Sequence, residues 1–142
     1  MEYKRFGDDI VVRLEIGEDV IVSLTKLCDL ERIGAASVTA IGATDRVKIG
    51  LYDVSTREYH SRILTGPMEI TSLVGNISRK DGAPYIHLHI NVGDEESKVS
   101  GGHLNECRIS ATCEIFVHVL SGTASRKLDP ATGLNVLDLN NQ

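Results

Sequence analysis

The sequence has little aromatic character, because it contains no tryptophan, four tyrosines and two phenylalanines among 142 residues. Its hydrophobic fraction of 42% is nonetheless ordinary for a globular protein. We therefore expect a core built mainly from Val, Ile, Leu and Ala. The length suits one self-sufficient core, so a single domain over residues 1–142 is expected.

Long apolar runs are also missing, and none approaches the roughly 20 residues that cross a bilayer. The first nine residues are too charged for a signal peptide. The three cysteines are an odd number without a Cys-x-x-Cys pair. Cys107 and Cys113 share a face of one predicted strand but lie too far apart to bridge. These features predict a cytoplasmic protein with reduced thiols and no membrane partner.

Basic residues are fewer than acidic ones, with 15 Lys and Arg against 20 Asp and Glu, a net charge of -5. Such a chain repels phosphate backbones overall, so nucleic-acid binding would need a local basic patch. The Lys and Arg residues are dispersed and form no continuous stripe. Neither a Walker lysine motif, a Gly-x-Gly-x-x-Gly fingerprint after a strand nor a Gly-x-Ser-x-Gly elbow is present.

One helix is predicted near residues 23–34. Ser23 is a suitable N-cap, and Gly34 is a suitable C′ residue with positive φ. The spacing of the apolar residues between them predicts a buried stripe of Leu24, Leu27, Cys28 and Leu30.

The rest of the chain has β patterns. Strands are expected at 10–16, 37–43, 46–53, 58–64, 68–78, 85–92, 99–104 and 107–120, with a turn at 80–84. One helix with many hairpin-linked strands indicates an α+β domain with a largely antiparallel sheet. Apolar residues on nominally polar strand faces suggest that a partner chain covers part of the sheet.

The strand at 85–92 carries a histidine stripe, because its residues alternate in polarity without a break. Side chains alternate across a strand, so one face receives Ile86, Leu88, Ile90 and Val92, and the other receives Tyr85, His87, His89 and Asn91. Two imidazoles about 7 Å apart at their Cα atoms can converge on one ion. His103 follows Gly101-Gly102 and would complete a three-histidine site.

His87, His89 and His103 have two interpretations. They form a metal site, or they are partly exposed polar residues at a sheet edge. Neutral imidazole binds Zn²⁺ well, and Ni²⁺, Co²⁺ or Fe²⁺ would also fit. Three protein ligands leave a coordination position open for water, as in catalytic sites. The two glycines allow a bulge or a close backbone approach, which is compatible with placing His103.

Other polar groups give weaker signals. The acidic run at 94–96 is more typical of a solvated loop than of acid–base catalysts. Glu114 and His118 share a strand face at i and i+4. They are candidates either for hydrogen-bond partners of the metal ligands or for polar groups of a subunit interface. Cys28 falls in the helix stripe and is expected in the core.

Several motifs together resemble the plant and prokaryote conserved (PPC) domain family over about Arg13 to Leu139. The matching segments are Gly42-Ala43, Tyr52-Asp53, Glu69 to Ile77, Pro84 to His89 and Gly101 to Leu104. The resemblance implies a mixed α/β fold with a central antiparallel sheet, assembled as a homotrimer. The three-histidine set resembles the prokaryotic, stand-alone branch. In the plant members AT-hooks of the Arg-Gly-Arg-Pro type bind DNA, and this chain has none.

Three functions follow. The first is a homotrimer whose divalent transition metal, Zn²⁺ before others, is held by His87, His89 and His103 and binds or transforms a small molecule. Water activation would be the default mechanism of an enzyme, but no general base is evident, and no catalytic residue is assigned. The second is the DNA-binding or transcription-associated role given by the family label. The third is a trimeric scaffold.

Overall fold

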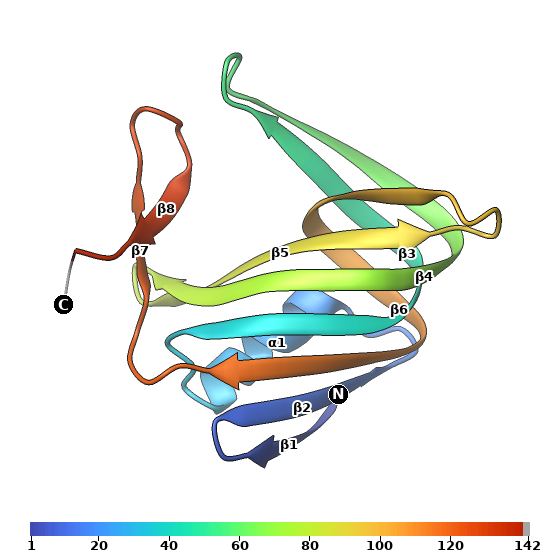
Figure 1. Ribbon diagram of the computed structural model, residues 1–142, viewed down its shortest axis with the longest axis horizontal. Helices are drawn as coiled ribbons and strands as arrows, with labels where there is room; N and C mark the ends of the chain where they lie inside the picture. The colour runs from blue at the N-terminus through green and yellow to red at the C-terminus, as the bar shows by residue number, and fades with distance from the viewer. Residues whose placement is uncertain (141–142) are drawn as a thin grey trace.

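The computed structural model describes residues 1–140 and contains one helix and eight strands (Figure 1). The helix is α1 (Val20–Leu30). The strands are β1 (Glu2–Phe6), β2 (Asp9–Glu15), β3 (Ala36–Asp53), β4 (Glu58–Lys80), β5 (Ala83–Gly93), β6 (Val99–Val119), β7 (Ser125–Leu128) and β8 (Asn135–Asp138). No helix among residues 1–140 is long and apolar enough to cross a membrane.

The strands form one mixed, largely antiparallel sheet, as predicted. Its order is β1-β2-β6-β3-β4-β7-β8, and β5 pairs with β4 and β6. The parallel contact joins Arg79 of β4 to Ser125 of β7. The β4–β5 hairpin turns at Asp81-Gly82, and both residues have positive φ, as a two-residue turn of this kind requires.

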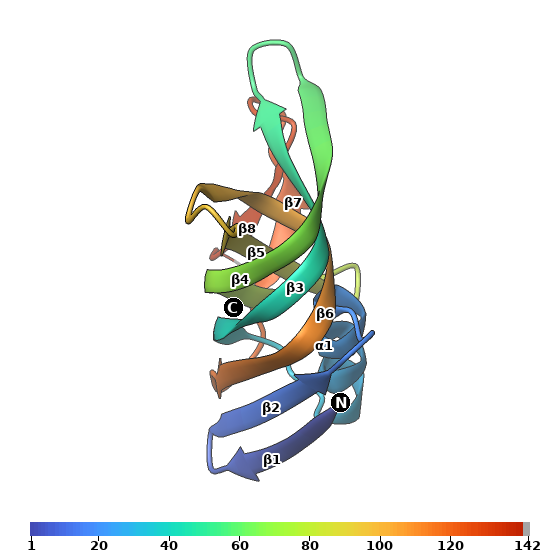
Figure 2. The same cartoon turned by 90° about the vertical axis from the view of Figure 1, so that its right-hand side faces the viewer.

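The core lies between α1 and one face of the sheet (Figure 2). Leu24, Leu27 and Cys28 of α1 are fully buried there, which confirms their place in the stripe, whereas Leu30 is exposed. The three cysteines are free and buried. Burial raises the pKa of Cys28 and of Cys107 to about 11 and that of Cys113 to about 12, so all three are protonated at neutral pH.

Both predicted ends of the helix were wrong. The N-cap is Asp19, whose carboxylate accepts hydrogen bonds from Val22 N at 3.0 Å and from Cys107 N at 2.8 Å. Ser23 lies inside the helix and does not cap it. The Asp19 carboxylate caps the first turn instead and also links it to β6. At the other end, Arg32 rather than Gly34 has a positive φ, of 53°. A Cβ at Gly34 would lie 2.6 Å from Gly122 O, so this glycine serves close packing.

The strand boundaries also differ, because three pairs of predicted strands are single long strands. Segments 37–43 and 46–53 belong to β3, 58–64 and 68–78 to β4, and 99–104 and 107–120 to β6. In β3, the interruption of the apolar alternation coincides with irregularities in the pairing with β4, at Ala40/Gly42 and Thr44/Arg46. Buried Thr44 donates to Arg108 O at 2.6 Å there, and the strand continues through the irregularity. β1, β7 and β8 were not predicted.

The length of β6 closes a ring of four strands. β3 pairs with β4, β4 with β5, β5 with the first part of β6, and β6 with β3. His103 lies where β6 is shared, because it is opposite His89 of β5 and opposite Gly50 of β3. This closure determines where the polar face of β5 meets β6.

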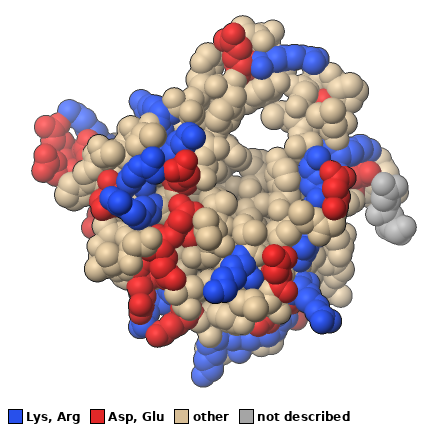
Figure 3. Space-filling model, turned by 180° about the vertical axis from the view of Figure 1, so that it is seen from behind, with Lys and Arg blue, Asp and Glu red and all other residues tan. Residues whose placement is uncertain are grey.

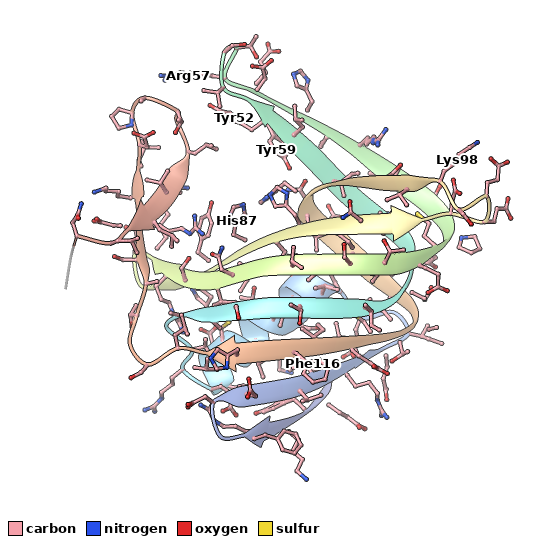
Figure 4. The ribbon with its side chains drawn as sticks, in the orientation of Figure 1. Tyr52, Arg57, Tyr59, His87, Lys98 and Phe116 are labelled. Atoms are coloured by element: carbon pink, nitrogen blue, oxygen red, sulfur yellow. The ribbon has the colours of Figure 1, made fainter. Side chains whose placement is uncertain are left out.

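The sheet face opposite α1 carries exposed apolar side chains. Phe116 of β6 is 55% exposed, and Val74 of β4 is 51% exposed. Both lie opposite Thr39 of β3 in the register, so they flank the same residue. Figure 4 shows Phe116 among the strands of this face. Subunit contact through the face stays a prediction.

Gly75→Ala tests how closely β4 approaches β5. A Cβ at Gly75 would lie 2.0 Å from His87 O and 2.9 Å from Leu88 Cα. Both are backbone atoms, so we expect a loss of about 1–3 kcal/mol in the free energy of unfolding, measured with urea. At Gly93 of β5 the nearest atom to a Cβ would be Thr71 Cγ2 at 3.5 Å, an ordinary contact. Gly93→Ala is therefore the matched control, and equal losses in both variants would contradict the packing argument.

Candidate metal centre

His87, His89 and His103 converge as the sequence predicted. The ring centroids are 5.4 Å apart for His87 and His89, 5.2 Å for His87 and His103, and 5.5 Å for His89 and His103. One nitrogen of each ring lies within 4.8 Å of the other two. Tetrahedral bonds of about 2.05 Å hold the ligand nitrogens about 3.3 Å apart, which falls within this limit of 4.8 Å. All three residues belong to one chain, and the arrangement can hold a metal ion.

The backbone explains this convergence. His87 and His89 are two residues apart on β5 and therefore share its polar face, while Leu88 between them is fully buried. His103 reaches the same face because β6 pairs closely with β5 at Gly101. A Cβ at Gly101 would lie 2.7 Å from Ile90 O and 2.1 Å from Asn91 Oδ1. The Gly-Gly pair thus permits the approach that brings the third imidazole to the other two.

The environment favours the neutral form of two of these imidazoles, His87 and His103. The pKa of His87 is lowered to about 4, mainly by burial and then by the charges of Arg126, His103 and His89. The pKa of His103 is also lowered, by burial first and then by His89. A neutral imidazole has a free ring lone pair, so at pH 7 these two rings are ready to coordinate a cation.

Arg126 of β7 lies beside the histidines, and sequence reasoning missed it. Its Nε donates to Ser78 Oγ at 2.8 Å, Nη1 to Asn135 O at 2.7 Å and Nη2 to Asn76 Oδ1 at 2.8 Å. Nη2 is 3.5 Å from His87 Nδ1, and the guanidinium stacks on the ring of Tyr85 at 4.5 Å. No periodic pattern marked this arginine, because β7 is only four residues long.

The three histidines line a cavity of about 1230 Å³ between the β3–β4 hairpin and the β7–β8 hairpin. Figure 3 shows an opening into the molecule from behind, and Figure 4 shows His87 and Tyr59 extending into the space between these hairpins. Tyr59 of β4 packs edge-on against His103, with centroids 6.3 Å apart, and donates to Asn105 Oδ1 at 2.7 Å. Among residues 1–140, no Asp or Glu lines the cavity.

Two hydrogen bonds join the hairpins across the outer side of this cavity. Arg57 Nη2 at the tip of the β3–β4 hairpin donates to Pro130 O at 2.9 Å. Tyr52 OH donates to Thr132 O at 3.1 Å. Figure 4 labels both side chains at the end of the hairpin. Segments more than 70 residues apart in sequence thereby form one enclosure.

The other polar candidates do not join the three histidines. His118 Nδ1 lies 2.8 Å from Asp9 Oδ1 on β2, and Glu114 is exposed opposite Arg13. Neither contacts the three histidines. The acidic run at 94–96 is exposed, and Asp94 accepts backbone hydrogen bonds within its own loop. The prediction of a solvated loop is confirmed.

The lowered pKa of His87 gives a prediction about acid. The unfolded chain binds a proton at His87 below pH 6.5, whereas the folded chain resists it until about pH 4. The contribution of this group to stability is therefore intact above pH 6.5 and is lost as the pH falls toward 4. In metal-free protein, the His87 ring resonances in NMR should titrate with a midpoint near 4. A midpoint near 6.5 would show that the ring is solvated and unperturbed.

Solved structures with the same fold cover almost the whole chain. A candidate DNA-binding protein from Bacteroides thetaiotaomicron is 30% identical, with a TM-score of 0.94 and 96% of each chain covered. A metal-containing protein from Archaeoglobus fulgidus is 37% identical, with a TM-score of 0.87 and 96% of each chain covered. Among curated proteins, the bifunctional protein GlmU of Synechococcus is 34% identical over 125 residues. The match covers 86% of this chain but only 19% of that protein.

A family model decides the relationship. The model described as the Plants and Prokaryotes Conserved (PCC) domain matches residues 1–121, which include all the strands that carry the three histidines. The resemblance seen in the sequence motifs is thereby confirmed. The chain belongs to the Plants and Prokaryotes Conserved domain family.

Proposed function

We propose that this protein binds a divalent transition metal, Zn²⁺ before others, at His87, His89 and His103, and uses it to bind or act on a small molecule. The observation that carries the proposal is the placement of three ring nitrogens within 4.8 Å of one another at a cavity of about 1230 Å³. Imidazole ligands suit Zn²⁺ and its neighbours in the first transition row.

The donor set fits an exchangeable position on the metal rather than a closed structural site. Structural zinc has four protein ligands, whereas three leave room for water or a ligand. A bound ion would supply Lewis acidity there. The chain supplies the walls: Tyr59 fixes one side of His103, and Arg126 lies against His87. Without an acidic group among the described lining residues, binding is as well supported as catalysis.

Metal content tests this proposal directly. Protein purified without a histidine tag should contain close to one equivalent of metal per chain in elemental analysis. His87→Ala, His89→Ala and His103→Ala should each lose most of it, because two imidazoles bind too weakly to survive dialysis. His118→Ala, whose ring pairs with Asp9 instead, is the matched control and should retain the metal.

A wild-type protein that remains empty after zinc titration would overturn the metal site. Equal metal content in His103→Ala and His118→Ala would show that the ion is held elsewhere.

We further propose that the protein is a cytoplasmic homotrimer of single PPC domains. Support comes from the family and from the exposed apolar side chains on the open face of the sheet, which is the face opposite α1. These side chains are Phe116, Ile41 and Val74. Burying such groups between subunits removes apolar area from water, which is a main source of association energy.

Phe116→Glu tests the assembly. A carboxylate on the open face would lose its hydration at a subunit contact, so we expect the variant to shift from trimer to monomer. Light scattering coupled to size-exclusion chromatography should give a particle mass of three times the chain mass for the wild type and of one chain mass for the variant. Val22→Glu, on the exposed side of α1, is the control that should stay trimeric. A wild-type monomer would contradict the proposal.

DNA binding is the second candidate, because a relative of 30% identity is described as a candidate DNA-binding protein. On the face seen in Figure 3, however, Lys and Arg are interspersed with Asp and Glu. Phosphate contacts need clustered positive charge and weaken steeply with salt. Gel-shift experiments at low salt test this second candidate. DNA whose migration is not slowed by the protein under those conditions would exclude DNA binding.

A further inference from the structure

We infer that the ligand of this cavity is a small carboxylate with an apolar tail, in which Arg126 recognises one carboxylate oxygen. The other oxygen takes the coordination position that His87, His89 and His103 leave open. The inference rests on the proposed metal site and names the chemical class that the site would accept.

The Arg126 guanidinium is held in place by uncharged groups and is not neutralised. Arginine has five N–H groups, and three of those of Arg126 are used by Ser78, Asn135 and Asn76. All three acceptors are uncharged. Within residues 1–140, no Asp or Glu forms an ion pair with Arg126, whereas the similarly shielded Arg79 lies 3.6 Å from Asp29. A fourth N–H, on Nη2, faces His87 Nδ1 at 3.5 Å. Arg126 is thus a fixed, partly buried cation that has one further N–H to donate to a ligand.

With a divalent ion bound, the cavity would carry an excess of positive charge. Three neutral imidazoles do not offset the two positive charges of a divalent ion, and Arg126 and Arg62, which both line the cavity, add two more. No described lining residue is acidic, although the chain as a whole carries a net charge of -5. Charges in a partly buried site interact more strongly than in water. An anion is the complement that this set of groups lacks.

Arg126 lies close enough to the histidines to share a ligand with them. Nη2 of Arg126 lies 3.5 Å from His87 Nδ1, so a group bound beside the His87 ring is within reach of the guanidinium. Arginine donates charge-assisted hydrogen bonds to carboxylates at about 2.7–2.9 Å. A carboxylate presents two oxygens, so it can meet a metal ion with one and Arg126 with the other.

The apolar tail follows from the wall beyond the charged groups. Leu51 of β3, Leu134 and Leu137 line the same cavity and are 64%, 41% and 40% exposed. Exposed leucines from two separate hairpins that face one cavity are suited to cover an alkyl or similar group. Arg126, Leu134 and Leu137 also lie beyond residue 121, where the family model ends. The C-terminal hairpin therefore supplies most of this wall, and the matched residues add Leu51.

The test uses the zinc-loaded full chain and isothermal titration with acetate, butanoate, hexanoate and the neutral hexanamide. Affinity should rise by up to about fourfold for each methylene that becomes buried. Hexanamide should bind at least about tenfold more weakly than hexanoate, because it loses the charge-assisted contact. Arg126→Gln should weaken hexanoate binding about tenfold to a hundredfold while its zinc content stays unchanged. Arg13→Gln, a charge change on β2 outside the cavity, should bind like the wild type.

Equal affinity for hexanoate and hexanamide in the wild type would overturn the inference, as would unchanged hexanoate binding in Arg126→Gln. If that variant does not fold, Arg126→Lys and the acid–amide comparison in the wild type decide the question. Failure of the metal site itself is recognised separately, because zinc would then be missing from the wild type before any carboxylate is added.

Discussion

The structure depends on one pairing, in which the first part of β6 lies against both β5 and β3. This pairing closes the four-strand ring, places His103 opposite His89 and leaves a cavity beside the histidines. It requires the backbones to approach closely, and Gly101 permits this because a side chain there would collide with Ile90 O. Without the closure, the polar face of β5 would be an ordinary exposed strand surface.

Two parts of the chain contribute different residues to the enclosure around the three histidines. The residues matched by the family model provide the three imidazoles and the glycines that bring them together. The C-terminal hairpin provides Arg126 and two leucines, and it is held over the site by Arg57 and Tyr52 of the β3–β4 hairpin. A relative can therefore match residues 1–121 without sharing the wall that Arg126 and the two leucines form.

Much of this arrangement could be predicted from sequence because it follows local periodicity. The alternation from Tyr85 to Val92 correctly placed His87 and His89 on one face. Register across β5 and β6 is not local, so the sequence could suggest but not establish that His103 joins them. The helix start was misplaced because Asp19 caps the helix and also binds Cys107 N, a residue 88 positions away. Arg126 was missed because a short strand has no periodicity to reveal it.

The central claim is that three imidazoles of one chain form the first coordination sphere of a metal. X-ray absorption spectroscopy at the zinc edge of the loaded protein tests it most directly. The account predicts three imidazole nitrogens at about 2.0–2.1 Å, with the outer-ring scattering of imidazole, and one further light-atom ligand. A sulfur ligand at about 2.3 Å, or a sphere with fewer than three imidazoles, would contradict it.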